Sequence, residues 1–414
     1  MPSSNNLLTP TIIAKESLMQ LVNSMAMSRH VHTAYKNEFV KVGQTITVRK
    51  PNKFRATKAQ ARSNSNISEP STSITMSTQA HVSWAFSSVE LTTTIEDYSK
   101  RYITPAAAAL ANQVDSDLCA LYKNIYNYAG TPGTTPATFK VLGDAQTVLD
   151  DEAAPSEGRV AILNPAAHWS LADGLKGTFA PSVAKDIITK GYLGTIGNLS
   201  LYMDQNVQRH TTGAFTASAT PLISNDVVTG ATTFPTDGWN ASSSTVLAGD
   251  IFTVSSVYGV NPMSGASTGV LKRWLCTADT TSDGGAMATL VIAPTLVYAA
   301  TNPYTNCSRT AGATNIMVDN DVMTFVGSES TAYPQNLVFH PNAFALVTVP
   351  IELPANVWGA RETDPDAGLS IRVGGVPYNF SSRGYGRSSS CHSETSINCA
   401  ITLHINDPSA AAAC

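Results

Sequence analysis

The stretch that decides the fold is QNLVFHPNAFALVTVPIELP at residues 335–354, which is followed ten residues later by DPDAGLSIRV at residues 364–373. The first stretch is dense in aliphatic and aromatic residues, and short runs of such residues between turn signals are typical of buried strands. The closing segment 335–408 therefore predicts strands joined by one helical turn, with a last strand at 401–405. Neither stretch has the form of a catalytic motif, so the function is expected in the surfaces of the chain.

Composition supports a β-rich chain with extensive contacts between subunits. The 414 residues suffice for one to three domains, and 43% of them are hydrophobic. Only 14% are charged, well below the usual share, and small polar residues take their place. The net charge of −4 argues against tight binding of nucleic acid and leaves a weak local contact with DNA open.

Cysteines and targeting signals point to a reducing compartment. The six cysteines form no CxxC pair, and their spacing fits neither a zinc ribbon nor a zinc finger, so we expect free thiols. The first residues lack a basic region followed by an apolar one, so no signal peptide is expected. No apolar run approaches the length of a transmembrane helix, and no membrane partner is expected.

Residues 1–41 predict an N-terminal arm that contains a helix. Thr9 is a suitable cap and Pro10 a suitable first helical residue. One face collects apolar residues at helical spacing, namely Ala14, Leu18, Leu21, Val22 and Met25. Two interpretations stay open: the helix packs on its own domain, or it lies over a neighbouring subunit.

Residues 42–95 predict a long β-hairpin. Apolar and polar residues alternate in the outgoing strand at 45–48 and again in the return strand between 74 and 91, as in a ribbon with two unlike faces. The tip at 63–73 is rich in Ser and Asn, which favour turns.

The hairpin also carries a run of bases without an acid between Glu38 and Glu69. Three interpretations stay open: a solvated basic edge that blocks stray strand pairing, a contact with nucleic acid, or docking on an acidic neighbour. The bases are Lys41, Arg49, Lys50, Lys53, Arg55, Lys58 and Arg62.

Residues 96–205 predict a long helix followed by an α+β block. The helix is expected to start at the cap Thr104, to end at Gly130 and to span roughly 38 Å over about 25 residues. Its apolar stripe consists of Ile103, Ala107, Leu110, Val114, Leu118, Leu121, Ile125 and Tyr128. The block that follows predicts a helix at 138–152, a strand at 159–163, a helix from 165 to 175 capped by Asn164, and a strand at 193–203.

Residues 206–325 predict an inserted β module. They are dense in Thr, Ser, Gly and Asn, and short β runs recur between polar turns, which is typical of a small barrel or sandwich. The expected strands are 220–223, 250–257, 271–278, 288–293 and 316–318. The module looks inserted because the α+β pattern resumes at Asn336.

The sequence also contains an acidic cluster, opposite in charge to the basic hairpin. Asp144, Asp150, Asp151, Glu152 and Glu157 occur without a base between Lys140 and Arg159. Their spacing is not that of an EF-hand calcium loop. Two interpretations stay open: a solvated helix end, or a landing site for the basic hairpin of a neighbour.

Enzymatic motifs are missing from the sequence. There is no GxSxG elbow, HExxH pair, Walker loop or GxGxxG turn, and no cofactor is expected. The eight histidines are scattered. Only His30 and His32 are close enough to share one strand face, and ordinary surface histidines are expected there in preference to a two-histidine metal site.

Several of these segments resemble the Hong Kong 97-type coat proteins of tailed bacteriophages. TPAAAALANQVDSDL (104–118) resembles that family's spine helix, AILNPAAHWSL (161–171) its peripheral-domain strand and helix, and GTIGNLSLYMDQNV (194–207) the entry to its axial domain. The two stretches quoted first resemble the return into that domain. The resemblance covers residues 5–375, and the Ser/Gly/Cys-rich tail after Val373 departs from it.

The resemblance implies an α+β Hong Kong 97-type fold in five segments. These are an N-terminal arm (1–41), an E-loop hairpin (42–95), the spine helix with the peripheral domain (96–205), the axial-domain entry with an inserted small β-barrel (206–325), and the axial return with the tail (326–414). The inserted barrel points to the P-twenty-two-like podovirus branch.

The resemblance further implies a non-enzymatic major capsid protein. It would form a homo-oligomer of pentamers and hexamers, with the hairpin over a neighbouring subunit. Its partners would be a scaffolding protein, a portal protein and packaged double-stranded DNA, the last through weak non-specific contact. Assembly would take place in the host bacterial cytoplasm, and a rounder precursor shell would mature into an angular one.

Two other classes stay open. A β-rich phage tail or receptor-binding protein would share the composition, but it would be present in few copies per particle. A hydrolase with an unrecognised site is the third class.

Overall fold

A computed structural model gives the fold and divides the chain into two compact units, which we describe separately. Unit 1 comprises Met1–Val48, Ser71–Leu118 and Phe344–His404, and unit 2 comprises Arg49–Pro70, Cys119–Ala343 and Ile405–Cys414. Helices and strands are mixed in the chain, which confirms the α+β prediction. The structure describes residues 10–33, 45–50, 52–54, 60, 69–75, 78–87, 99–175, 193–215, 220–298, 302–309, 316–349, 358–364, 369–377, 392–405 and 411–413.

A five-stranded sheet forms the centre of unit 1. Its order is β19-β22-β21-β20, and β3 also pairs with β22. The bounds are β3 Thr78–Ser87, β19 Phe344–Val349, β20 Trp358–Asp364, β21 Leu369–Pro377 and β22 His392–Ile405. The tail after Val373 therefore supplies the long strand β22, of which the sequence predicted only the last five residues.

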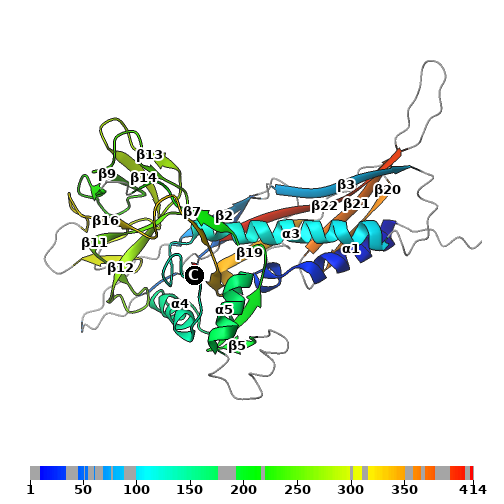
Figure 1. The fold of residues 1–414 in the computed structure, drawn as a ribbon, viewed down its shortest axis with the longest axis horizontal. Helices are drawn as coiled ribbons and strands as arrows, with labels where there is room; N and C mark the ends of the chain where they lie inside the picture. Colours follow the sequence, from blue (N-terminus) through cyan, green and yellow to red (C-terminus); the bar gives the residue numbers. More distant parts are fainter. Residues whose placement is uncertain are drawn as a thin grey trace, which may run out of the picture. The chain divides into compact units, whose positions relative to one another are not determined.

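The first helix packs on this sheet. Helix α1 (Pro10–Ser24) lies against β20 and β21 (Figure 1). Its predicted apolar face is confirmed, because Ala14, Leu18 and Leu21 are buried. Of the two interpretations left open, the structure therefore shows the helix packed within its own unit. A short 3-10 helix, η1 (Met27–His30), follows it.

The predicted hairpin is confirmed only at its base. β1 (Thr45–Arg49) pairs with β2 (Ser71–Thr75), and the Lys50 N–H donates to the Pro70 carbonyl at 2.8 Å. The expectation that the return strand continues along the same ribbon is wrong, because β3 pairs with β22 over its whole length. A remote strand competes for the same backbone groups, and local alternation cannot reveal it.

The long helix is shorter and starts earlier than expected. Helix α3 spans Thr104–Ala120, preceded by a π-helical turn, η4 (Ser99–Ile103), and followed by a 3-10 turn, η5 (Leu121–Asn124). Thr104 is therefore not the cap. Pro105 has no N–H to continue the α-helical pattern, which accounts for a different hydrogen-bond spacing just before it. The apolar stripe is buried from Ile103 to Leu118.

The α+β block of unit 2 follows the sequence closely. Helix α4 (Phe139–Asp151), strand β4 (Arg159–Leu163) and helix α5 (Pro165–Leu175) confirm three predictions. The Asn164 side chain accepts a hydrogen bond from the Ala167 N–H at 2.8 Å, which confirms the cap.

The strand expected at 193–203 is instead a tight hairpin. Gly197 and Asn198 adopt φ values of 56° and 66°, as a two-residue turn between β5 (Thr195–Ile196) and β6 (Leu199–Met203) requires. The sheet of this block has the order β23-β18-β4-β6-β5. Its remaining strands are β18 (Leu337–Phe339) and β23 (Ala411–Ala413).

The inserted module is a small closed barrel, as predicted (Figure 1). Its order is β15-β11-β12-β14-β9-β8, with β16 paired to β11. The Ile223 N–H donates to the Asp321 carbonyl and the Met323 N–H to the Pro221 carbonyl, both at 2.9 Å, so β8 lies beside the entry to β16 and closes the ring. The strands are β8 Leu222–Ile223, β9 Thr233–Asp237, β11 Ile251–Val260, β12 Ser267–Cys276, β14 Ala288–Ala293, β15 Cys307–Arg309 and β16 Met323–Phe325.

Aromatic side chains fill the barrel. Trp274, Phe252 and Phe234 are fully buried and pack ring against ring. The strand expected at 316–318 is wrong, because this stretch makes only an isolated bridge to Val227. Two smaller pairs of strands accompany the barrel. β10 (Thr245–Val246) pairs with β13 (Thr280–Thr281), and β7 (Arg209–Thr211) pairs with β17 (Ala332–Pro334), which follows the module in sequence.

Candidate functional site

The basic residues of the hairpin are the first candidate contact surface. Arg49 donates to Glu69 at 3.0 Å, and both side chains are exposed, at 79% and 51%. Lys50 and Lys53 are also exposed. A pair this exposed contributes roughly 0–1 kcal/mol, so it leaves the basic surface available to a partner. Arg55, Lys58 and Arg62 lie outside the described residues.

The start of the hairpin loop also touches its own chain. The Lys53 N–H donates to the Tyr304 hydroxyl at 3.5 Å, and that hydroxyl donates to the Asn52 side chain at 3.4 Å. Both bonds are long for their type and weak. They set the start of this loop beside the β module of unit 2 and leave the side chain of Lys53 exposed.

The acidic cluster is paired within the chain. Asp144 accepts from Lys140 at 2.6 Å, one helical turn away, and Asp150 accepts from the buried Arg159 at 2.6 Å. The carboxylates of Asp144 and Asp150 remain 44% and 61% exposed. These two acids therefore have the exposure that a landing site requires.

Glu152 and Asp151 face the barrel. Glu152 accepts from Lys272 of β12 at 2.9 Å, and the two side chains are only 16% and 3% exposed. Burial raises the pKa of Asp151, and the charges of Glu152 and Asp150 add to the rise while Arg273 opposes it. These two acids belong to an internal contact more than to an outer surface.

Two cation–ring contacts extend this internal cluster. The Lys272 ammonium lies 4.7 Å from the centre of the Tyr126 ring, and the Arg273 guanidinium lies 4.9 Å from that of Tyr128. The cluster joins barrel strand β12 to the end of α4 and to the segment after η5. Sequence reasoning missed it because Lys272 and Arg273 lie more than a hundred positions after the other members.

A second buried polar cluster was also missed. His210 of β7 bonds to Asp250 through Nε2 at 2.9 Å and to the Tyr122 hydroxyl through Nδ1 at 3.2 Å. A carboxylate only accepts, so Nε2 donates to Asp250, and the Tyr122 hydroxyl pairs with Nδ1. Burial, with the charge of Asp250, raises the pKa of Tyr122 to about 12.

This second cluster serves structure more than chemistry. Asp250 also accepts from the N–H groups of Gly213 and Leu247, at 3.1 and 2.7 Å, so its carboxylate is fully engaged. His210 and His168 are both buried, at 6% and 7% exposure. His30 lies in η1 and His32 in a bridge to Ala345, so they do not share a regular strand.

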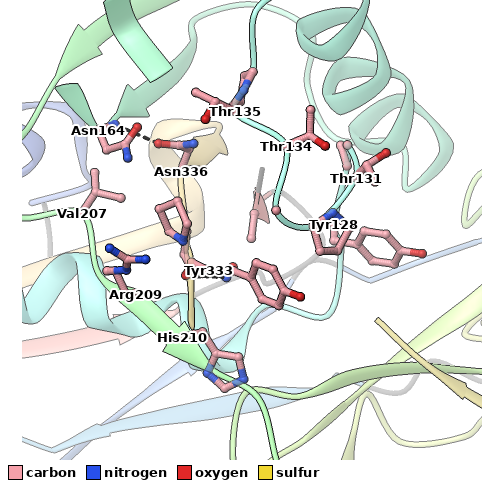
Figure 2. Close-up of a pocket in the computed structure, with 18 of the residues that line it drawn as sticks. Tyr128, Thr131, Thr134, Thr135, Asn164, Val207, Arg209, His210, Tyr333 and Asn336 are labelled. Carbon is pink, nitrogen blue, oxygen red and sulfur yellow. Dashed lines mark hydrogen bonds between the residues drawn. The ribbon is translucent and has the colours of Figure 1, made fainter. Parts of the chain in front are cut away.

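A cavity of about 800 Å³ opens beside this cluster (Figure 2). The loop at 131–136, with its threonines, forms one wall, and Arg209 and Tyr333 come from the strands that enter and leave the barrel. Among the described residues, no three His, Cys, Asp or Glu side chains are grouped to hold a metal ion. No described helix is long and apolar enough to cross a membrane.

Comparison with known proteins finds relatives only among solved structures. No family model and no curated protein sequence matches the chain. A structure from Mycobacterium phage Che8 matches at 12% identity and a TM-score of 0.46, covering 94% of this chain and 90% of that one. The capsid structure of Cyanophage P-SCSP1u matches at 9% identity and a TM-score of 0.41, covering 90% and 83%.

A virus-like particle from Pyrococcus furiosus matches at 8% identity and a TM-score of 0.38, covering 97% of this chain and 96% of that one. Capsids of bacteriophage PhiM1, Ralstonia phage GP4 and Myoviridae phage XM1 are also similar. All these TM-scores lie below 0.5.

Proposed function

We propose that this chain is a major capsid protein with a Hong Kong 97-type fold. Many copies assemble into the pentamers and hexamers of an icosahedral phage head that encloses double-stranded DNA. The inserted barrel favours the P-twenty-two-like podovirus branch of that family. The protein has no enzymatic role and no cofactor in this proposal.

One observation carries the proposal. Three segments that resemble the family pair in a single sheet, although two of them precede the barrel in sequence and the third follows it. β4 comes from AILNPAAHWSL, β6 from GTIGNLSLYMDQNV, and β18 from QNLVFHPNAFALVTVPIELP. β4 pairs in parallel with β6 and antiparallel with β18, for example Ile162 with Leu337. The chain leaves this sheet, builds the barrel and returns beside its starting point, as an inserted module requires. The resemblance assigned β4 to the peripheral domain and β6 and β18 to the axial domain, whereas the structure joins all three in one sheet.

Surface chemistry supports assembly over catalysis. The chain has few charges, and exposed apolar side chains such as Trp169, Phe139 and Met263 remain on the described surface. Obligate interfaces bury roughly 2,000–5,000 Å² and are more apolar than the remaining surface. One sequence that serves two kinds of ring needs polar contacts that tolerate small changes of angle. The basic hairpin supplies such contacts.

For these polar contacts we retain the predicted pairing between neighbouring copies. Arg49, Lys50, Lys53, Arg55, Lys58 and Arg62 form the basic side, and Asp144 and Asp150 are the acids best placed to receive it. Asp151 and Glu152 stand in the same cluster but lie against the barrel of their own chain. Their part in the landing site is therefore smaller.

The remaining partners follow from the same proposal. A scaffolding protein and a portal protein are needed to build and fill a head of this type. Packaged DNA is touched weakly and without sequence preference, in keeping with the net charge of −4. Cys276 and Cys307 are buried thiols outside any disulfide, which suits assembly in the reducing host cytoplasm.

Copy number separates this proposal from a tail or receptor-binding protein. Virions that contain the chain are purified, and its mass is quantified against that of the portal protein. A capsid protein is present in hundreds of copies per particle. A ratio near that of the portal would refute the proposal and favour a tail role.

A further inference from the structure

A slot in unit 2 holds the last described strand of the chain. Along one edge, β23 pairs antiparallel with β18, with Ala412 opposite Val338. Along the other edge, the Ala413 N–H donates to the Asn127 carbonyl at 3.1 Å, and the Ala129 N–H donates to the Ala413 carbonyl at 3.0 Å. The strand is therefore hydrogen-bonded on both sides, although it is only three residues long.

The slot is fully packed around the side chain of Ala412, which is 0% exposed. Ala413, on the other face of the strand, is 4% exposed and lines the cavity described above. Ala412 belongs to the apolar core formed with Leu142, Ala145 and Val338. Extra side-chain volume at a fully packed position typically costs about 1–3 kcal/mol, so a leucine at 412 would oppose binding of the strand.

We propose that this slot is a strand-accepting site for an extended peptide with small side chains, and that residues 411–413 of the same chain occupy it as a tethered ligand. The binding mode is strand addition, in which backbone hydrogen bonds give affinity and tight side-chain pockets give selectivity. The inference concerns the single chain and does not depend on capsid assembly.

The tether explains how so short a strand remains bound. An attached ligand has an effective concentration on the order of millimolar, so it fills a site too weak to hold the free peptide at micromolar concentration. A free copy of the peptide therefore competes poorly with the native strand. It binds once the native strand is prevented from entering.

Disulfide trapping in the full chain tests the occupant. Val338→Cys and Ala412→Cys are combined with Cys414→Ser, because residues opposite each other in an antiparallel pair have Cβ atoms about 4.5–5.5 Å apart. The control is Val338→Cys with Ala413→Cys, since Ala413 lies opposite Leu337 and its side chain points to the other face. We expect an intramolecular cross-link only in the first pair. Cross-linked dimers, or equal trapping in both pairs, would overturn the proposal.

Peptide binding tests the selectivity. The labelled peptide NDPSAAAA, which copies residues 406–413, is titrated by fluorescence anisotropy into the full chain and into Ala412→Leu. We expect at least about tenfold tighter binding to Ala412→Leu, because its own strand no longer competes. The same peptide with leucine at its seventh position should not bind. Equal binding to both proteins, or none to a folded Ala412→Leu, would refute the site; should that variant fail to fold, the trapping result decides.

Discussion

Lys272 of the barrel and Glu152 at the end of α4 form a buried ion pair at 2.9 Å, between residues 120 positions apart. The Tyr126 hydroxyl also donates to Glu152, at 3.3 Å, so the carboxylate has two partners. A buried pair of this kind adds little net stability but is costly to break, because the remaining charge has no partner. It therefore fixes how the barrel sits against the helix that precedes β4.

Replacing one member of this ion pair should destabilise the chain more than its share of the loss when both members are replaced together, because a single replacement leaves an unpaired buried charge. We expect Lys272→Met or Glu152→Leu alone to lower the free energy of unfolding by about 3–5 kcal/mol, since each leaves one charged group buried without its partner. The double variant Lys272→Met with Glu152→Leu should lose clearly less than the two single losses together. Urea unfolding, monitored by circular dichroism, measures the free energy of unfolding of the two single variants and of the double variant. Strict additivity would show that the two side chains do not interact.

A second prediction concerns Asp115 of α3. Its buried carboxylate accepts from the backbone N–H groups of Ala26 and Ser28, at 2.6 and 3.1 Å, and so holds the start of η1. Hydrogen bonds to a charged group contribute about 1.5–3 kcal/mol, so Asp115→Ala should cost at least that much. Asp117→Ala is the matched control, because Asp117 bonds only to the exposed Gln113 side chain in the same helix. Equal losses for the two variants would contradict the assignment.

A third prediction concerns alkaline pH. Burial raises the pKa of Tyr122 from its ordinary value of 10.0 to about 12 in the folded chain. Below pH 10 both states keep the proton. Between pH 10 and 12 the unfolded state loses it while the folded state retains it, so stability falls as pH rises through this window. A difference of this size corresponds to roughly 2–3 kcal/mol.

Tyr122→Phe isolates that contribution from other alkaline titrations. Burial also raises the pKa of the Cys307 thiol to about 12, so the wild-type curve contains more than one group. We expect the loss of stability between pH 10 and 12 to be smaller in Tyr122→Phe than in the wild type. The exposed Tyr202→Phe serves as the control for loss of a phenol hydroxyl. Parallel curves for wild type and Tyr122→Phe would contradict the buried tyrosine.

A fourth prediction tests the basic hairpin. Reversing Arg49, Lys50 and Lys53 to Glu should block assembly while the monomer stays folded, because all three side chains are exposed. The matched control reverses three other exposed bases with the same change in net charge, namely Lys15, Lys123 and Arg361. Light scattering reports assembly and circular dichroism reports folding. Normal assembly of the hairpin variant would remove the docking proposal.

The parts of the fold that the sequence predicted well are those fixed by local signals. Helix α5 follows from the Asn164 cap and Pro165, and β14 from a bounded β-branched run. Strand β22 was largely missed because Glu394, Asn398 and Ala400, residues of low strand propensity, interrupt its first part, and its pairing with β3 and β21 decides the outcome. The Lys272–Glu152 and His210–Asp250 pairs were missed because their partners are 120 and 40 positions apart. No local sequence signal near one partner indicates the other.

The central claim is that copies of this chain build a closed shell. The most direct measurement is electron microscopy of the product formed when the chain is expressed with the scaffolding protein of the same phage. The account predicts isometric particles with pentamers and hexamers of this chain in their walls. Folded monomers that form no particles, with their secondary structure verified by circular dichroism, would contradict it.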